Sequence, residues 1–188
     1  LTIYPYNNDT WFKPALLGGQ EDFGGSCALR VTTPSSLIPG TALMRFPMSN
    51  VDCGYIRGNA DSAALVLTSS SLDNGPVTVD IYEVTSNWSS GTTGLSGCTE
   101  CSVSTNISAG AAFVAPSKGA TPRASFTVDT ACKTYKVDLT ALVTDWCDNP
   151  MAHPNYGVLL RVSGGGIVAP KSVVFHSSEA PAAVRPYL

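Results

Sequence analysis

Several aromatic side chains of this chain lie in segments rich in glycine and asparagine, where a ring can remain exposed. An aromatic ring packs against the apolar face of a sugar ring, and neighbouring polar groups hydrogen-bond the sugar hydroxyls. The sequence therefore predicts a sugar-binding surface formed by Tyr6, Trp11, Tyr55, Arg57 and Asn59. Phe12 belongs to the same group of loop aromatics. The alternative is that these rings only cover the open end of the fold.

Three aspartates could supply oxygen ligands to a metal ion. Asp9, Asp52 and Asp61 lie in segments with the composition of loops and turns. Calcium takes six to eight oxygen ligands, and the dense acidic pattern of an EF-hand is missing here. The sequence allows a structural calcium at these residues and predicts no other cofactor.

A base, two hydroxyls and a carboxylate follow one another at His176-Ser177-Ser178-Glu179. Successive side chains of a strand point to opposite faces, and the sharp strand-to-helix turn that exposes a serine nucleophile is missing. We therefore expect these side chains to bond backbone groups where the last strands bend. His153 lies among prolines and is expected in a loop.

A glycoside-cleaving enzyme would normally need two carboxyl groups about 5 to 9.5 Å apart across a groove. Asp138 and Asp145 flank the best-defined segment of the chain, and we expect their side chains to point away from each other. No catalytic residue is therefore predicted. A polysaccharide-degrading enzyme is the second alternative function.

Six cysteines and a low lysine content indicate an oxidising compartment. The motif Cys98-Thr99-Glu100-Cys101 has no second pair to complete a zinc site, and the βαβ context of a redox motif is missing. Pairing cysteines that are close in sequence predicts the disulfides Cys27–Cys53, Cys98–Cys101 and Cys132–Cys147. Three sequons, at Asn8, Asn87 and Asn106, are candidate N-glycosylation sites and agree with secretion.

The composition fits one domain that spans residues 1–188, with 44% hydrophobic residues. Charged residues make up 13% and the net charge is −3, so a basic face for nucleic acid is not expected. No run of 18 apolar residues suggests a membrane span. We expect a secreted or cell-surface protein whose signal peptide, if any, has been removed.

Short apolar runs with turn residues between them predict a protein built of strands. The predicted strands are Leu1–Pro5, Cys27–Val31, Thr41–Phe46, Ala63–Thr68, Val77–Val84, Ala124–Val128, Thr134–Val137, Tyr156–Val162 and Ser172–Ala180. Residues 6–25 lack periodicity and are predicted to form a long loop. This pattern is typical of an all-β fold, an antiparallel β-sandwich of the jelly-roll type.

One short helix is predicted over Leu139–Trp146. Leu139, Leu142, Val143 and Trp146 follow the spacing i, i+3, i+4 and i+7, which places them on one helical face. Thr140 could cap the first turn. Trp146, like Trp88, follows apolar positions and is assigned to the core at the ends of the sandwich.

The order of several motifs resembles the DNRLRE family of extracellular jelly-roll domains, which is related to the disaggregatase repeat and to one group of carbohydrate-binding modules. The matching segments are an opening strand leading to Asp9, then residues 43–46, 63–67, 79–84 with Trp88, 137–146, 155–160, 175–180 and 185–188. The chain departs from the pattern after Trp88, where residues 98–101 and an Ala/Ser-rich run replace a tryptophan-containing stretch. The resemblance implies a jelly roll and favours carbohydrate binding.

The sequence therefore predicts a secreted or cell-surface, non-catalytic module that binds polysaccharide, such as a cell-wall or matrix glycan. The first alternative is a structural or adhesive subunit of an extracellular assembly or filament, with copies of itself as partners. The net acidity argues mildly against a highly anionic glycan, because like charges repel.

Overall fold

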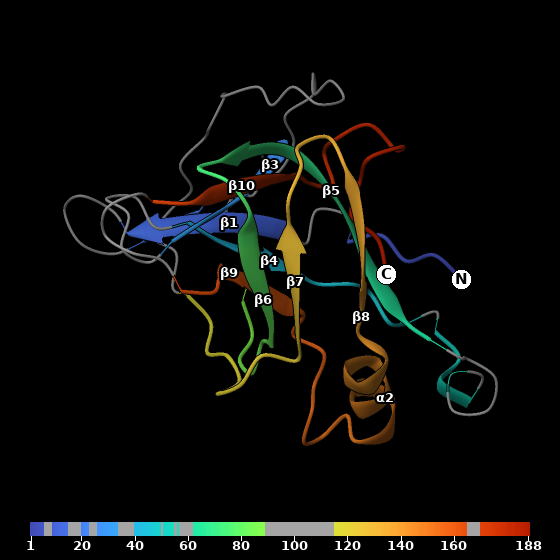
Figure 1. Cartoon of the computed structure of the whole chain (residues 1–188). Helices are drawn as coiled ribbons and strands as arrows, with labels where there is room; N and C mark the ends of the chain where they lie inside the picture. Colours follow the sequence, from blue (N-terminus) through green and yellow to red (C-terminus); the bar gives the residue numbers. More distant parts are fainter. Residues whose placement is uncertain are drawn as a thin grey trace.

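The computed structural model describes residues 1–5, 9–14, 20–22, 26–33, 40–49, 51–54, 56, 62–88, 115–164 and 170–188 of the chain. For residues 11, 13, 14 and 20–22 the description covers the backbone alone. Two antiparallel sheets and helix α2 (Thr140–Asp148) account for most of the described part, which confirms the predicted all-β sandwich (Figure 1).

The strands of the described residues form a six-stranded and a four-stranded sheet. The six-stranded sheet has the order β2-β1-β4-β9-β6-β7 and the four-stranded sheet the order β3-β10-β5-β8. Their bounds are β1 Asp9–Pro14, β2 Gln20–Asp22, β3 Ala28–Thr32, β4 Thr41–Met44, β5 Ala64–Asp73, β6 Val77–Glu83, β7 Ala124–Val128, β8 Thr134–Asp138, β9 Val158–Val162 and β10 Ser172–His176.

The pairing of eight of these strands is that of a jelly roll. The first pairs with the last, the second with the second-last, and so on inward: β3 with β10, β4 with β9, β5 with β8 and β6 with β7. A long hairpin of four strand pairs, rolled up so that alternate pairs share a sheet, gives two facing sheets. Strands β1 and β2 then extend the six-stranded sheet beyond β4.

The main core fills the space between the two sheets. Alternation along each strand supplies it, as in β6, where Val77, Val79 and Ile81 are fully buried between exposed or half-buried neighbours. Phe46 and Phe175 are the largest fully buried side chains. The burial of such side chains contributes roughly 1.5–3 kcal/mol each and holds the sheets together.

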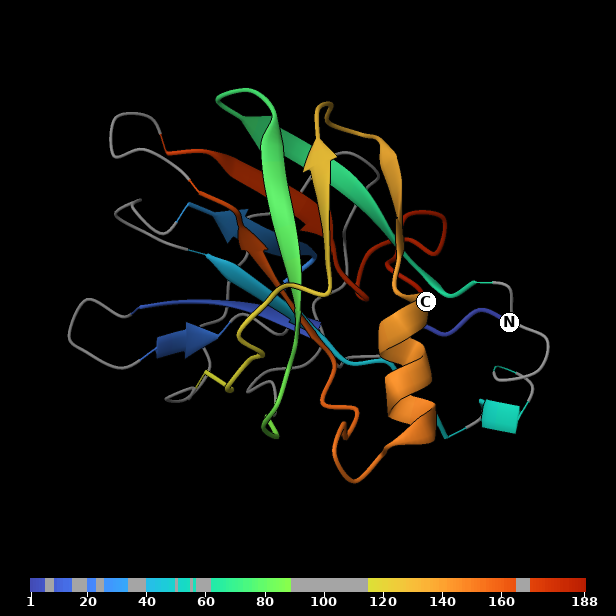
Figure 2. The ribbon, with the colours of Figure 1, turned by 60° about the horizontal axis from the view of Figure 1, so that its bottom comes forward.

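Helix α2 (Thr140–Asp148) closes one end of the sandwich beside β8 (Figure 2). The predicted face is confirmed, since Leu142, Val143 and Trp146 are buried in the main core. The predicted cap is wrong: Leu139 occupies the N-cap position without a side-chain bond. Asp138 instead accepts hydrogen bonds from the Thr140 backbone N–H at 2.8 Å and the Thr140 hydroxyl at 2.6 Å.

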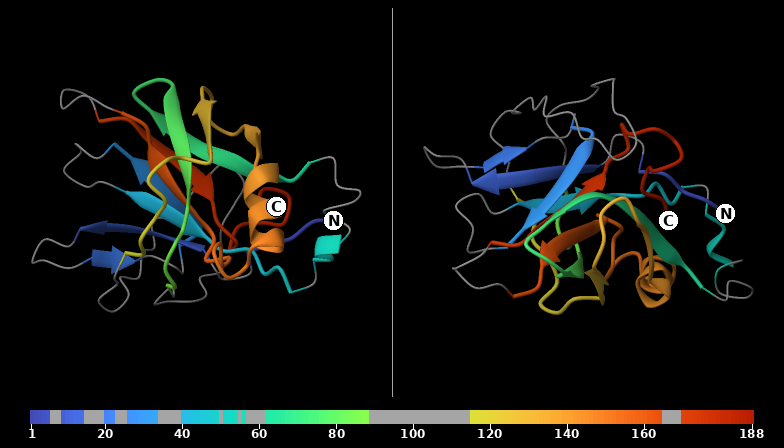
Figure 3. Two further views of the ribbon diagram at one scale, coloured as in Figure 1. Left: turned by 90° about the horizontal axis from the view of Figure 1, so that it is seen from below. Right: turned by 45° about the horizontal axis from the view of Figure 1, so that its top comes forward.

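The N-terminal segment differs from the prediction. Residues 6–25, predicted as one loop, contain β1 and β2. Residues 1–5, predicted as a strand, form none, because Ile3 exchanges just two backbone hydrogen bonds with Leu188. Tyr187 forms a bridge with Val66 of β5, so both chain ends lie side by side near α2 (Figure 3).

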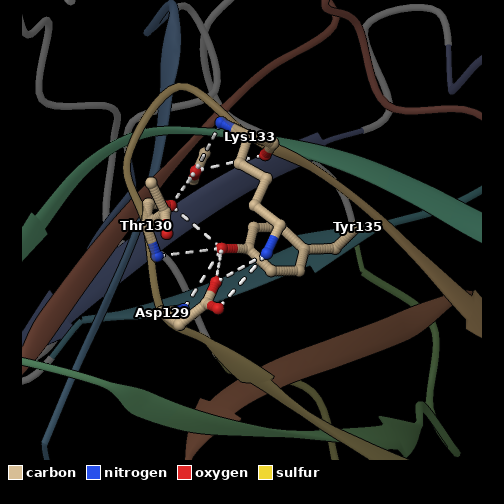
Figure 4. Close-up of polar contacts among 5 residues, drawn as sticks. Asp129, Thr130, Lys133 and Tyr135 are labelled. Carbon is tan, nitrogen blue, oxygen red and sulfur yellow. Dashed lines mark hydrogen bonds and ion pairs between the residues drawn. The ribbon is translucent and has the colours of Figure 1, made fainter.

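The turn between β7 and β8 is locked by Tyr135 (Figure 4). Its phenolic oxygen accepts from the backbone N–H groups of Asp129 and Thr130, both at 3.1 Å. Lys133 pairs with Asp129 at 2.9 Å, and the lysine and the tyrosine hydrogen bonds lower the pKa of Asp129 to about 2. The turn therefore satisfies its own polar groups.

The disulfide between Cys53 and Cys147 ties the segment before residue 56 to the last turn of α2. The predicted pairs Cys27–Cys53 and Cys132–Cys147 are therefore wrong. Cys132 precedes β8 whereas Cys147 follows it, so the length of that strand separates them. Cys27 and Cys132 are also disulfide-bonded. The predicted pair Cys98–Cys101 lies outside the described residues.

In the described part of the chain, no helix is both long and apolar enough to cross a membrane.

Candidate functional site

Two acidic side chains from opposite ends of the chain meet in a cluster that we call the acid pair, Asp9 of β1 and Glu179 after β10. Asp9 is 1% exposed and accepts from the Ser178 backbone N–H at 2.7 Å. The Ser178 hydroxyl oxygen lies 2.6 Å from Asp9 Oδ1 and 3.1 Å from Glu179 Oε1. Ser177 donates its hydroxyl to Glu179 at 2.7 Å.

The arrangement of the acid pair favours a bound proton. Two carboxyl groups share the single hydroxyl hydrogen of Ser178, so their negative charges are not both compensated by it. Burial, and then the charge of Glu179, raise the pKa of Asp9 to about 7. Burial also raises the pKa of Glu179, while Arg185 opposes this shift. Because Asp9 is buried, a polysaccharide cannot reach it, and the pair joins the first strand to the end of the last.

Glu83, Arg123, Asp145 and His153 form a second polar cluster, between the sheet and α2. Arg123 bonds Glu83 at 2.5 Å and Asp145 at 2.9 Å. His153 Nδ1 lies 2.9 Å from Glu83 Oε1, a partner that sequence analysis did not find. Hydrogen bonding to Glu83 raises the pKa of Arg123. Since an arginine neutralises the carboxylate, this cluster acts as a structural clamp between the helix and the sheet.

The outer face of the six-stranded sheet carries a second, smaller hydrophobic cluster. Phe12, Leu43 and Leu159 lie side by side on β1, β4 and β9, and Val84 and Trp88 adjoin them. Trp88 is buried as predicted, but in this outer cluster rather than in the main core. Its indole N–H donates to the Tyr156 carbonyl at 2.7 Å. Apolar residues therefore follow both faces of β4 and β9.

Beside this cluster lies a depression that we call the sheet-face hollow, with a volume of about 350 Å³. It is lined by Phe12, Thr32, Thr41, Ala115, Pro116, Lys118, Leu159 and Arg161. Ligand sites of proteins are concave, largely apolar and equipped with a few polar groups, with volumes of about 300–1,000 Å³. The hollow fits this description.

Two strands and one irregular segment position the cations of the hollow. Arg161 follows Leu159 by two residues on β9, so both side chains point to the outer face. Lys118 is held by a bridge between its backbone and Val84, at the end of β6. Its ammonium lies 3.5 Å from the centroid of the Tyr82 ring. Burial, and then the charge of Arg161, lower the pKa of Lys118.

Phe12, which the sequence groups with the predicted sugar-binding aromatics, lines the hollow. The backbone of Trp11 pairs with Ala42 in the ladder between β1 and β4, and its side chain is not described. Tyr6, Tyr55, Arg57 and Asn59 lie outside the described residues. Sequence analysis missed Lys118 and Arg161, although the alternation Leu159-Leu160-Arg161 marks Arg161 as facing outward.

The predicted calcium ligands have other partners or fall outside the description. Asp9 starts β1 rather than lying in a loop, and both its oxygens bond Ser178. Asp52 accepts from the Gly54 N–H at 2.9 Å, and Asp61 is outside the described residues. Within the described ranges, no group of three or more His, Cys, Asp or Glu side chains is placed to hold a metal ion.

Asn87 is the one candidate glycosylation site within the described residues, and it is exposed. Its side-chain oxygen accepts from Arg45 at 2.8 Å. Asn8 and Asn106 lie outside the described residues.

Comparison with known proteins found no matching family model and no curated protein of significant sequence similarity. The resemblance to the DNRLRE family therefore stays a prediction.

Proposed function

We propose that this chain is an extracellular, non-catalytic module that binds polysaccharide in the sheet-face hollow. The observation that carries the proposal is the composition of the hollow. Phe12, Leu159 and Pro116 offer apolar surface for the C–H faces of a sugar, and Thr41 offers a hydroxyl. Lys118 and Arg161 add cationic donors for sugar oxygens.

Two further observations support the proposal. The Cys53–Cys147 disulfide agrees with an oxidising, extracellular compartment. The nested strand pairing is that of the jelly roll which the DNRLRE resemblance implies, and some jelly rolls of this kind bind carbohydrate. A shared fold does not by itself imply a shared function, so the proposal rests on the residues of the hollow.

The acidic residues support a binding role rather than hydrolysis. Asp9 of the acid pair has the raised pKa of a general acid but is buried beneath the surface. Asp138 bonds Thr140, and Asp145 pairs with Arg123, so each of these two acids has a structural task. Hydrolysis would need two carboxyl groups that face a shared groove.

A retention assay on immobilised polysaccharides tests the proposal. Thr41→Trp would fill the hollow from β4, while Thr127→Trp places the same ring on β7, at an exposed site of the same sheet. We expect T41W to weaken binding at least tenfold and T127W to leave it unchanged. Release of reducing or unsaturated sugar ends would overturn the non-catalytic assignment.

The same assay separates the structural alternative. If no polysaccharide is retained and the purified protein forms filaments or other ordered assemblies, the binding proposal is wrong. If both tryptophan variants bind as the wild type does, the glycan lies elsewhere on the molecule and the hollow is not the site.

A further inference from the structure

We propose that the sheet-face hollow recognises an acidic substituent of its polysaccharide through Lys118 and Arg161, so that the ligand is an acidic glycan. This inference rests on the proposed function and names its ligand class. It concerns a carboxylate or a sulfate ester, since both present negatively charged oxygens to the same donors.

The cations of the hollow form no ion pair with an acidic side chain of the described residues. The guanidinium of Arg161 has no hydrogen-bond or ion-pair partner in the part of the chain that the structure describes. The ammonium of Lys118 donates to the neighbouring Gly119 carbonyl at 3.2 Å and has no acidic partner within hydrogen-bond distance there. Two positive charges therefore face one concave surface.

Other partly buried cations of the fold have defined partners. Arg123 is paired with Glu83 and Asp145. Arg45 donates to Asn87 and to the Trp88 carbonyl, and lies over the Trp88 ring. Lys118 likewise has a carbonyl and the Tyr82 ring, so Arg161 is the cation of the hollow that lacks a partner in the described part of the chain.

The two cations of the hollow repel each other. Burial, and then the positive charge of Arg161, lower the pKa of Lys118, so the two charged groups lie close enough to interact. Asp80, which faces Arg161 across β6 and β9, opposes this effect but also accepts from the Ser125 hydroxyl at 2.6 Å. With one acid against two cations, the local charge is positive. An anion placed between Lys118 and Arg161 would relieve their repulsion.

The geometry also explains why the protein can bind an acidic polymer although its net charge is −3. Salt screens exposed charges over about 8 Å at physiological ionic strength, so the nearest groups decide the sign at a site. A guanidinium offers two parallel N–H donors to a carboxylate, and a partly desolvated ammonium adds a point charge. The expectation drawn from overall acidity therefore does not apply inside the hollow.

Isothermal titration with three soluble polymers tests the inference: a polyuronate, a sulfated galactan and a neutral glucan. We expect the wild type to bind at least one acidic polymer, at least tenfold more tightly than the neutral one, with affinity that falls as salt is added. Arg161→Gln and Lys118→Ala should each weaken that binding about tenfold or more. Lys136→Ala, an exposed cation on β8 of the other sheet, should leave it within twofold.

The outcomes separate this inference from the proposed function. Binding to the polyuronate alone or to the sulfated polymer alone supports the inference and identifies the acidic group. Tight binding to the neutral glucan, undisturbed by R161Q and K118A, overturns the inference while the binding function stands. Absence of binding to every polysaccharide overturns the proposed function itself. Thermal unfolding of each variant checks that the fold is intact, and R161Q preserves most of the side-chain volume.

Discussion

Replacing Asp9 by asparagine should make the stability of the protein much less dependent on pH above pH 5. When Asp9 of the acid pair is protonated, its Oδ1, 2.6 Å from Ser178 Oγ, can donate to that oxygen, while its Oδ2 accepts from the Ser178 N–H. An asparagine amide can form the same two bonds without a titrating proton. Asp9→Asn therefore copies the protonated state of the pair at every pH.

The magnitude follows from the difference between the folded and unfolded pKa values. The unfolded chain loses this proton near pH 3.8, whereas the folded protein keeps it until about pH 7. Between these values the unfolded state is ionised and the folded state is not, so each pH unit costs about 1.36 kcal/mol of stability. Stability is fully present below pH 3.8 and falls as pH rises. From pH 5 to pH 7, where half of the folded molecules have lost the proton, the loss is about 2.3 kcal/mol.

Urea unfolding at pH 5 and pH 8 measures this effect. The free energy of unfolding of the wild type should fall between these two values by about 2–3 kcal/mol, and that of D9N by much less. Asp129→Asn is the control, because Asp129 has a pKa of about 2 and therefore keeps the same charge between pH 5 and pH 8. If the wild type is as stable at pH 8 as at pH 5, the acid pair does not bind a proton as inferred. The same conclusion follows if D9N loses as much stability between these pH values as the wild type does.

Two pairs of substitutions test the packing. Trp88→Phe should lower the free energy of unfolding in urea by about 1–2 kcal/mol more than Trp146→Phe does. The reason is that the buried indole N–H of Trp88 has a carbonyl partner, whereas that of Trp146 has none in the described structure. Equal losses for the two variants would contradict the hydrogen bond of Trp88. Gly157→Ala should cost at least about 3 kcal/mol, since its φ is +93° and a Cβ would lie 2.1 Å from the Met44 carbonyl oxygen. Gly75→Ala, at φ +82° with nothing within 4 Å of the added Cβ, should cost about 1 kcal/mol. A G157A variant that is as stable as G75A would contradict the close approach of Gly157 to the Met44 carbonyl.

Local patterns in the sequence were sufficient for most strands and for the helix. Strand β7 was predicted with its observed bounds, and α2 within two residues, because both follow a regular apolar period. Strand β1 was missed, since its apolar residues, Trp11 and Phe12, are few and lie between turn residues. The sheet partner β4, far along the chain, organises this segment, and sequence periods carry no such information.

The candidate sites depend on contacts between distant residues. Asp9 and Ser178 are 169 residues apart, and a motif search does not connect them. The Cys53–Cys147 disulfide joins residues 94 positions apart, whereas the prediction paired neighbours. Lys118 lies in an irregular segment, so no period marks it as facing the same surface as Arg161. The fold alone brings these groups together.

The two backbone hydrogen bonds between Ile3 and Leu188 hold the first and last residues of this jelly roll next to each other. A short peptide linker could join the two ends without crossing the sandwich, and new ends could then be opened at Asn74 and Gly75, in the exposed turn between β5 and β6. Such a circular permutant would keep all four nested strand pairs. It would also place a fused reporter or surface anchor at the turn between the two sheets instead of beside α2.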